Sequence, residues 1–302
     1  MLKKQIVSAM KLEDIWNSFT DRMAEIELYH RAAKNTAKKE LQLINEQAEY
    51  LNEHPDFKDC SSSLHNMTFY EARDGMTRIY NFKERTIEDR HLDVILHKNK
   101  QYQWLLAEAY EEFEDFIEKL YAYYGKHNSS FWPLKDFGNI TLTELPDKTY
   151  DWYLEQAKKK KGTPQRIINR FRKYFNNLGE IEINNKFDIN LSLTISLIEK
   201  LRHIIVHKGG KVSSVDSFIK ITAESCGLYS NGNISEQNKG FIKNFFGSGK
   251  HSNLIALLEI RILPHMPIDI HVSRFQQLTG YLLAYSFLLV SFVDGAIKEK
   301  NA

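Results

Sequence analysis

The chain contains only two cysteines among its 302 residues, Cys60 and Cys226. They are far apart in the sequence and match neither the spacing of a metal site nor a disulfide framework. The chain begins Met1-Leu-Lys-Lys, but no apolar stretch of the kind found in secretion signals follows. These absences predict a protein of a reducing compartment, and we expect it to be cytoplasmic.

The chain also lacks a strong net charge and a long apolar run. Its formal charge is only +2, so any affinity for nucleic acid must come from local clusters of basic residues. One apolar stretch, Leu278 to Val293, is a membrane candidate, but it is shorter than the roughly 20 residues that a span needs. We therefore expect no membrane association. A helix that is apolar all round is better explained by burial on two sides, against its own bundle and a second subunit.

Helical periodicity dominates the pattern of apolar residues. Spacings of three and four predict a mainly α fold, a helical bundle with an N-terminal helical arm and a small β-containing insertion before the last helix. One helix should begin near Glu84 and continue through 105–124. Another should cover 164–178, with Thr163 as its N-cap and Gly179 as its stop. The remaining predicted helices lie at 15–51, where the spacing continues to Pro55 as a helical hairpin or arm, at 187–208 and at 272–297.

Two regions interrupt this pattern. Residues 54–75 are predicted to be an irregular linker, which gives an N-terminal arm or hairpin at 1–75 and a helical domain at 76–302. Residues 211–268 form the insertion, in which 218–222 and 254–263 are predicted strands. The stretch 227–252 between them is rich in glycine, serine and asparagine.

The most informative segment is Leu201-Arg-His-Ile-Ile-Val-His-Lys-Gly-Gly210. It places Arg202, His203 and His207 where an apolar helix reaches two glycines, which commonly end helices. Arginine matches the geometry of phosphate, and imidazole can transfer a proton near neutral pH. This combination predicts chemistry on a phosphodiester.

Arg202-His203-Ile204-Ile205-Val206-His207 resembles the Arg-polar-x-x-x-His signature of HEPN domains. The resemblance implies an all-helical domain that dimerises and cleaves RNA without a metal or cofactor, as in toxin-antitoxin and anti-phage ribonucleases. An antitoxin or another regulatory partner would then be possible. In the mechanism we expect, Arg202 binds the phosphate oxygens, His207 transfers a proton, and His203 orients or shares that transfer.

The spacing within the motif raises a geometric question. Residues five apart on an ideal helix lie about 140° apart, so Arg202 and His207 of one chain are poor partners. Either the last turn unwinds, or two chains assemble the site at a dimer axis. Glu199, three residues before Arg202, could orient its guanidinium across one turn, or could be an ordinary exposed glutamate.

A basic segment provides a second candidate surface. Eight cations lie within 16 residues, and some share a helical face opposite Ile168, Phe171 and Phe175. They could contact RNA phosphates, or they could be a solvated face balanced by the acidic 108–118 helix. The candidate RNA-binding residues are Lys158, Lys159, Lys160, Lys161, Arg166, Arg170 and Lys173, and Arg172 is the eighth cation.

Three other interpretations remain. His203 and His207 have the spacing of two zinc ligands on a helix, but Ile204 occupies the position where a zinc protease has glutamate, and no third ligand is nearby in sequence. A HEPN module without catalysis could bind a nucleotide, RNA or a partner protein. A purely structural protein that uses its N-terminal helices would tolerate changes at Arg202 and His207.

Overall fold

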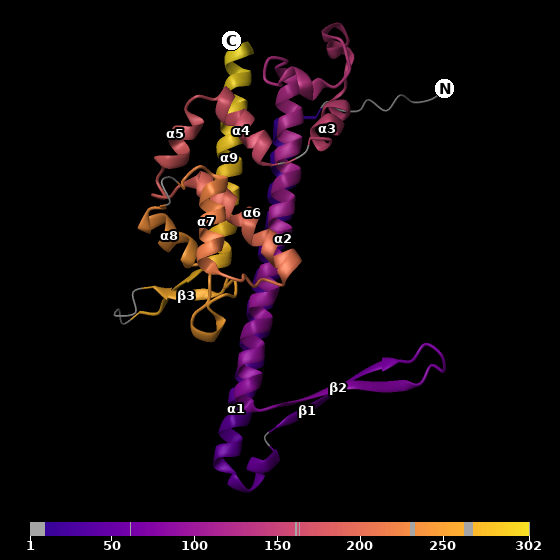
Figure 1. The fold of residues 1–302 in the computed structure, drawn as a ribbon, viewed down its shortest axis with the longest axis vertical. Helices are drawn as coiled ribbons and strands as arrows, with labels where there is room; N and C mark the ends of the chain where they lie inside the picture. The colour runs from indigo at the N-terminus through magenta and orange to yellow at the C-terminus, as the bar shows by residue number, and fades with distance from the viewer. Residues whose placement is uncertain are drawn as a thin grey trace. The chain divides into compact units, whose positions relative to one another are not determined.

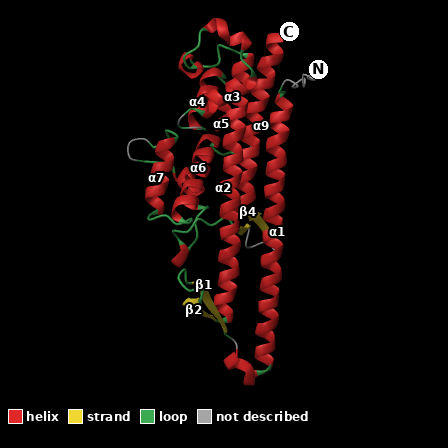
Figure 2. Ribbon diagram, turned by 90° about the vertical axis from the view of Figure 1, so that its right-hand side faces the viewer, coloured by secondary structure: helices red, strands yellow, loops and turns green. Residues whose placement is uncertain are grey.

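The computed structural model describes residues 10–60, 62–160, 162, 164–229, 233–262 and 268–301. These residues form nine α-helices, and 68% of the chain is helical, which confirms the predicted mainly α class (Figures 1 and 2). The chain divides into a larger unit, Met1–Glu27 with Gln103–Ala302, and a smaller unit, Leu28–Tyr102. Two long helices, α1 (Leu12–Glu53) and α2 (Ile87–His127), contribute residues to both units.

The smaller unit is built on the second half of α1 and the first half of α2. Its apolar core consists of Ala37, Ile44 and Val94, with Leu41 and Ile87 packed against them. Two polar contacts join the same helices: Arg90 donates to Gln47 at 2.6 Å, and a ring nitrogen of His91 lies 2.6 Å from the Asn45 side-chain oxygen. The start of α2 at Ile87 and its continuation through 105–124 agree with the sequence prediction.

An antiparallel β-hairpin connects these two helices after a short 3₁₀ helix (Pro55–Cys60). Strand β1 (Ser63–Tyr70) pairs with β2 (Thr77–Arg85), and the register shifts between Met67 and Thr68. The prediction of an irregular linker at 54–75 is therefore wrong for most of its length. The reason is that β1 buries little, so its sequence lacks the alternation by which a half-buried strand is recognised.

The centre of the larger unit is the second half of α2. Apolar residues at spacings of three and four form a buried stripe on this helix, because Leu106, Tyr110, Phe113, Ile117, Leu120 and Tyr124 are each at most 2% exposed. The first turns of α1 pack on the same unit, and Phe19 stacks on Phe116 with ring centroids 4.7 Å apart. Helix α9 (Arg274–Asn301) runs beside this part of α2 in both views (Figures 1 and 2).

Helix α9 has two different sides. Leu278, Leu282, Tyr285, Leu289 and Val293 are completely buried, whereas Phe287 is 57% exposed. Within the described residues, its span Arg274–Lys300 is the one helix long and apolar enough to cross a membrane by length and composition. Within a single chain, one side of α9 is thus buried, and the apolar side chain of Phe287 on another side remains exposed to solvent.

Three short helices follow α2 in the larger unit. They are α3 (Tyr150–Lys158), α4 (Gln165–Tyr174) and α5 (Leu178–Ile183), preceded by 3₁₀ turns at Leu134–Phe137 and Leu142–Asp147. The prediction that one helix ends at Gly179 is wrong, because α4 ends at Tyr174 and Gly179 lies inside α5. Its predicted N-cap, Thr163, lies outside the described residues.

The insertion is more helical than its sequence suggests. Residues 218–222, predicted as a strand, lie in α7 (Val215–Ser225), and the stretch 227–252 contains α8 (Glu236–Lys243). Ser214 caps α7 by accepting from the Ser217 amide, and Phe218, Ile219, Thr222 and Ala223 are buried at helical spacing. Burial of this face outweighs the β propensity of its branched residues.

The second predicted strand is partly confirmed. Leu254 and Ile255 make isolated bridges to Lys211 and Phe246, and regular strand structure begins only at β3 (Glu259–Ile262). Strand β3 pairs antiparallel with β4 (Ile270–Ser273), which leads directly into α9. Residue 263, the end of the predicted strand, is outside the described residues.

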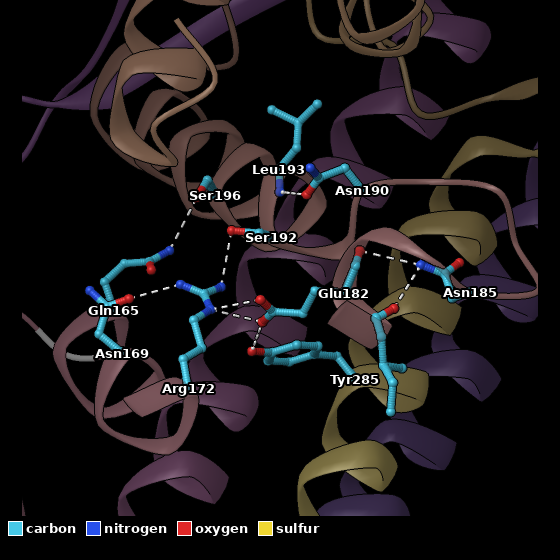
Figure 3. Close-up of polar contacts among 11 residues, drawn as sticks. Gln165, Asn169, Arg172, Glu182, Asn185, Asn190, Ser192, Leu193, Ser196 and Tyr285 are labelled. Carbon is cyan, nitrogen blue, oxygen red and sulfur yellow. Dashed lines mark hydrogen bonds and ion pairs between the residues drawn. The ribbon is translucent and has the colours of Figure 1, made fainter. Parts of the chain in front are cut away.

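A buried ion pair connects four helices of the larger unit (Figure 3). Arg172 of α4 donates its Nε to both carboxylate oxygens of Glu182 in α5, at 2.9 and 2.8 Å. Its Nη2 donates to Ser192 at the start of α6 (Leu191–Lys208), at 3.0 Å. Tyr285 of α9 donates to the same carboxylate at 2.5 Å.

The pair is almost shielded from water, since the Glu182 side chain is 4% exposed and Tyr285 is completely buried. Burial by itself would lower the pKa of Arg172, but Tyr285 and Glu182 outweigh it, and that pKa lies above its usual value. Burial and the Glu182 charge raise the pKa of Tyr285 well above its usual value. Arg172 therefore remains charged and Tyr285 remains a neutral donor.

We predict that Glu182→Ala destabilises the protein by about 3–5 kcal/mol, because it leaves Arg172 buried without its counter-ion. Urea unfolding followed by circular dichroism would measure the change. The matched control is Glu180→Ala in the same helix, which removes an exposed carboxylate and should shift the free energy of unfolding by less than about 0.5 kcal/mol. Equal stabilities of the two variants would contradict a structural role for the pair.

Candidate functional site

The motif lies on the last two turns of α6. Asn190 caps the start of the helix by accepting from the Leu193 amide at 2.9 Å, and Gly209 ends it in the left-handed region, with φ of 62°. The amide of Gly210 donates back to the Ile204 carbonyl at 3.1 Å. The predicted glycine stop is therefore confirmed, and Arg202 to His207 remain helical.

The end of α6 is held in place by α2. Gly210 approaches so closely that an added Cβ would lie 2.4 Å from the Gln103 side-chain oxygen. Gln103 is buried and donates to the Ile255 carbonyl at 2.7 Å, while the Ile255 amide donates to the Gly210 carbonyl at 2.9 Å. Only glycine fits at 210, and this close contact fixes where the motif ends.

Arg202 turns toward α2. Its Nη2 lies 2.7 Å from a carboxylate oxygen of Glu111, and the side chain is only 28% exposed. Its Nε is buried and has no hydrogen-bond partner among the described residues. Arg202 is thus anchored to α2 at one end by Glu111, and its unpartnered Nε lies inside the protein, out of contact with solvent.

Carboxylates surround this arginine. Burial raises the pKa of Glu114 from its usual value of 4.5 to about 7, the charge of Arg202 opposes the shift, and Glu111, Glu118 and Glu199 add to it. The buried hydroxyl of Tyr110 lies in the same field, and its pKa is raised well above the usual value by burial and by Glu199 and Glu114. Near neutral pH this cluster contains an acid that is only partly ionised.

The two imidazoles lie on a different face of α6. His203 and His207 are exposed, and their ring centroids are 4.6 Å apart. Slight burial and the positive charges of His207, Lys200, Lys208 and Arg202 lower the pKa of His203. His203 is therefore mainly neutral at pH 7 and can accept a proton.

The structure does not join Arg202 to His207 within one chain. In the described residues, no hydrogen bond or ring contact connects Arg202 with either imidazole. The helix continues regularly to Lys208, so the unwound last turn is not observed. The described residues also contain no group of three or more His, Cys, Asp or Glu placed to hold a metal ion.

Glu199 does not orient Arg202. Its carboxylate pairs with Lys200 at 2.9 Å, and its second oxygen is buried without a partner among the described residues. The acid that holds Arg202 comes from α2, because the guanidinium turns across the helix interface to Glu111 and away from its own helix. The sequence analysis offered Glu199, three residues before Arg202, as the acid that orients the guanidinium. The acid that does so is Glu111, which is 91 residues away in the sequence.

The predicted basic surface separates into two groups. Lys160 pairs with Asp136 and lies over the Tyr121 ring, and Arg170 donates to the carbonyls of Phe131 and Ser130, so both cations contribute to internal packing. Arg172 is in the buried ion pair with Glu182. Lys161 lies outside the described residues. The exposed members are Lys158, Lys159, Arg166 and Lys173.

Sequence reasoning missed the acids that contact the motif arginine. Glu111, Glu114 and Glu118 are spaced by three and four residues on α2, in the acidic 108–118 stretch that the sequence relates only to the basic segment. Their spacing does predict a single stripe. What it could not predict was that α6 would pack beside that stripe.

We predict that the free energy of unfolding falls as pH rises through the titration of Glu114. A carboxyl group whose pKa is raised in the folded state contributes stability that is fully present below about pH 4.5 and is lost as pH rises past 7. Glu114→Gln should therefore raise the melting temperature at pH 8.5 relative to the unmodified protein, and should have little effect at pH 5.

Thermal unfolding across this pH range would test the prediction. Glu108→Gln, on the same helix and facing Arg22, is the matched control and should not change the pH dependence in this way. A parallel pH profile for the unmodified protein and Glu114→Gln would show that Glu114 titrates in its ordinary range.

Comparison of the chain with protein-family models, curated proteins and solved structures gives no match.

Proposed function

We propose that this protein is a metal-independent endoribonuclease of HEPN type, acting as a toxin or anti-phage effector. The observation that carries the proposal is the end of α6, where one anchored arginine and two exposed imidazoles occupy two helical turns before a left-handed glycine. Cleavage through the ribose 2′-hydroxyl needs a base, an acid and positive charge for the phosphorane. These three side chains supply all of them.

Each side chain has a role that its surroundings support. The lowered pKa of His203 keeps it neutral and able to share proton transfer with His207. Arg202 would bind the phosphate oxygens. Its ion pair with Glu111 is no obstacle, because Glu111 is 58% exposed and such pairs contribute only about 0–1 kcal/mol. The products would be a 2′,3′-cyclic phosphate and a 5′-hydroxyl.

A dimer would complete the site. Arg202 and His207 of one chain point to different sides of α6, so we propose that two chains bring their motifs together at a twofold axis. Helix α9 supports association with a second copy, because only 28% of its most apolar stretch is buried within one chain. Lys158, Lys159, Arg166 and Lys173 would contact RNA phosphates beyond the cleavage point.

The second candidate is a HEPN module that binds a nucleotide, RNA or a partner protein without cleaving it. The observation that favours it is the ion pair of Arg202 with Glu111, together with the missing contact between Arg202 and His207. In such a module Arg202 would stabilise the packing of α6 on α2, and the imidazoles would be surface residues.

We predict that the purified protein cleaves total RNA or tRNA in excess EDTA, and that His207→Ala abolishes cleavage without unfolding the protein. His207 is exposed, so its loss should leave the melting temperature unchanged. The measurement is the gel pattern of fragments with their end chemistry. His271→Ala, an exposed histidine on β4, is the matched control and should remain active.

Each alternative has its own outcome in this experiment. Cleavage that EDTA blocks would favour a metal site, and full activity of His207→Ala would contradict the assignment of the proton-transfer group. RNA binding without cleavage, retained in His207→Ala, would support the non-catalytic module.

We further predict that Arg202→Ala and His207→Ala proteins, each inactive alone, regain activity when mixed and allowed to exchange subunits. A mixed dimer would contain one site with both groups intact, so random exchange should restore about a quarter of the unmodified rate. The rate of RNA cleavage after mixing measures this. Sedimentation would confirm that dimers form, and inactive mixed dimers would show that each chain uses its own arginine and histidine.

A further inference from the structure

A pocket of about 530 Å³ lies within the smaller unit, between α1, α2 and the β1–β2 hairpin. All of its lining residues belong to Leu28–Tyr102, and none of them belongs to α6. Its size is in the range of small-molecule sites, which are about 300–1,000 Å³. The pocket plays no part in the proposed function, and the inference drawn from it does not depend on that function.

The hairpin presents one of its faces to the pocket. His65 pairs with Lys83 and Met67 pairs with Asn81 in the strand register, so alternate residues His65 and Met67 lie on the same side of β1. The pocket lining includes His65, Met67 and Lys83 from this face. The register of the hairpin thus aims a basic pair and an apolar side chain at the helices.

The floor of the pocket is apolar. Ile44 and Val94 are core residues of the unit, and Leu43 and Met67 extend the apolar surface into the pocket. Leu43 is 63% exposed, so its apolar surface in the pocket is open to solvent. A ligand that fills this space would remove apolar surface from water, which is favourable.

The walls are mostly basic. Five basic side chains line the pocket, His65, Lys83, Arg85, Arg90 and His97, against two carboxylates, Glu40 and Asp93. One pair is already made, since Arg85 lies 3.1 Å from Asp93. Arg90 donates one of its nitrogens to the neutral Gln47 and forms no ion pair among the described residues.

Three of the basic side chains lack a polar partner in the part of the chain that the structure describes. Among the described residues, Lys83, His65 and His97 have no hydrogen-bond or ion-pair partner. With Arg90, they come from three different elements and surround one space. A planar carboxylate is matched by a single arginine, whereas a phosphate carries up to two charges and three oxygens that several donors can approach from different sides.

We propose that this pocket binds a small organic phosphate, with its phosphate group among Lys83, Arg90, His65 and His97 and its apolar body on Leu43, Ile44, Met67 and Val94. A nucleoside 5′-monophosphate has the size and the two-part chemistry that the pocket fits. The bound phosphate would offset the excess positive charge, and the base would cover the exposed floor. The chain would therefore carry a small-molecule site on its α1–α2 pair.

The test is isothermal titration of the full-length protein with adenosine 5′-monophosphate, compared with adenosine and with inorganic phosphate. We expect the nucleotide to bind at micromolar concentrations and both fragments to bind at least about tenfold more weakly, since each makes only one half of the contacts. Binding of inorganic phosphate as tight as that of the nucleotide would overturn the role of the apolar floor. No binding of the nucleotide would overturn the proposal.

Two variants locate the site. Lys83→Met should weaken nucleotide binding by about tenfold, the effect of one charged hydrogen bond, and Arg90→Gln should do the same. Lys38→Met is the matched control, because it removes an exposed positive charge from α1 outside the pocket and should leave affinity unchanged. Lys83 is exposed, so its substitution leaves the fold intact. Nucleotide affinity that neither pocket variant changes would place the binding elsewhere and overturn the assignment.

Discussion

The larger unit depends on the burial of one charge and its neutralisation. Arg172 lies among α4, α5, α6 and α9, where an uncompensated guanidinium would cost several kcal/mol. Glu182 supplies the opposite charge, Ser192 accepts a further hydrogen bond, and Tyr285 occupies a remaining acceptor site of the carboxylate. These contacts are directional, unlike apolar packing. They therefore fix the position of the start of α6 relative to α9. The orientation of α6, and so the position of the motif at its other end, follows from this.

A second constraint acts at the other end of α6, and it comes from α2. Gln103 holds the loop after Gly210, and Glu111, two turns further along, pairs with Arg202. One helix therefore places both the backbone and the arginine of the motif. The imidazoles receive no such partner and remain exposed. This difference divides the candidate site into a part that is preorganised by the fold and a part that is available to a substrate or a second chain.

The sequence predicted the features that depend on local periodicity and chain reversal. The stripe from Leu106 to Tyr124 and the end of α6 at Gly209 both follow from spacing alone. Features that depend on packing between distant segments could not be obtained in this way. The residues at 218–222 have the composition of a strand. They form part of helix α7 because the helical conformation buries one face of this segment. Arg172 looked like one more exposed cation, because its partner Glu182 becomes a neighbour only when α4 and α5 fold together.

The electrostatics of the motif differ between the two sides of α6, which bears on the proposed function. Arg202 lies among Glu111, Glu114 and Glu199, whose negative charge weakens the attraction of its guanidinium for a phosphate. The opposite holds on the face of His203, where Lys200 and Lys208 add positive charge. RNA would therefore approach the imidazole face first, and phosphate binding there would require a guanidinium from another direction. In the dimer proposed above, a second copy related by a twofold axis would supply that guanidinium, and the charge distribution on the two sides of α6 is compatible with this arrangement.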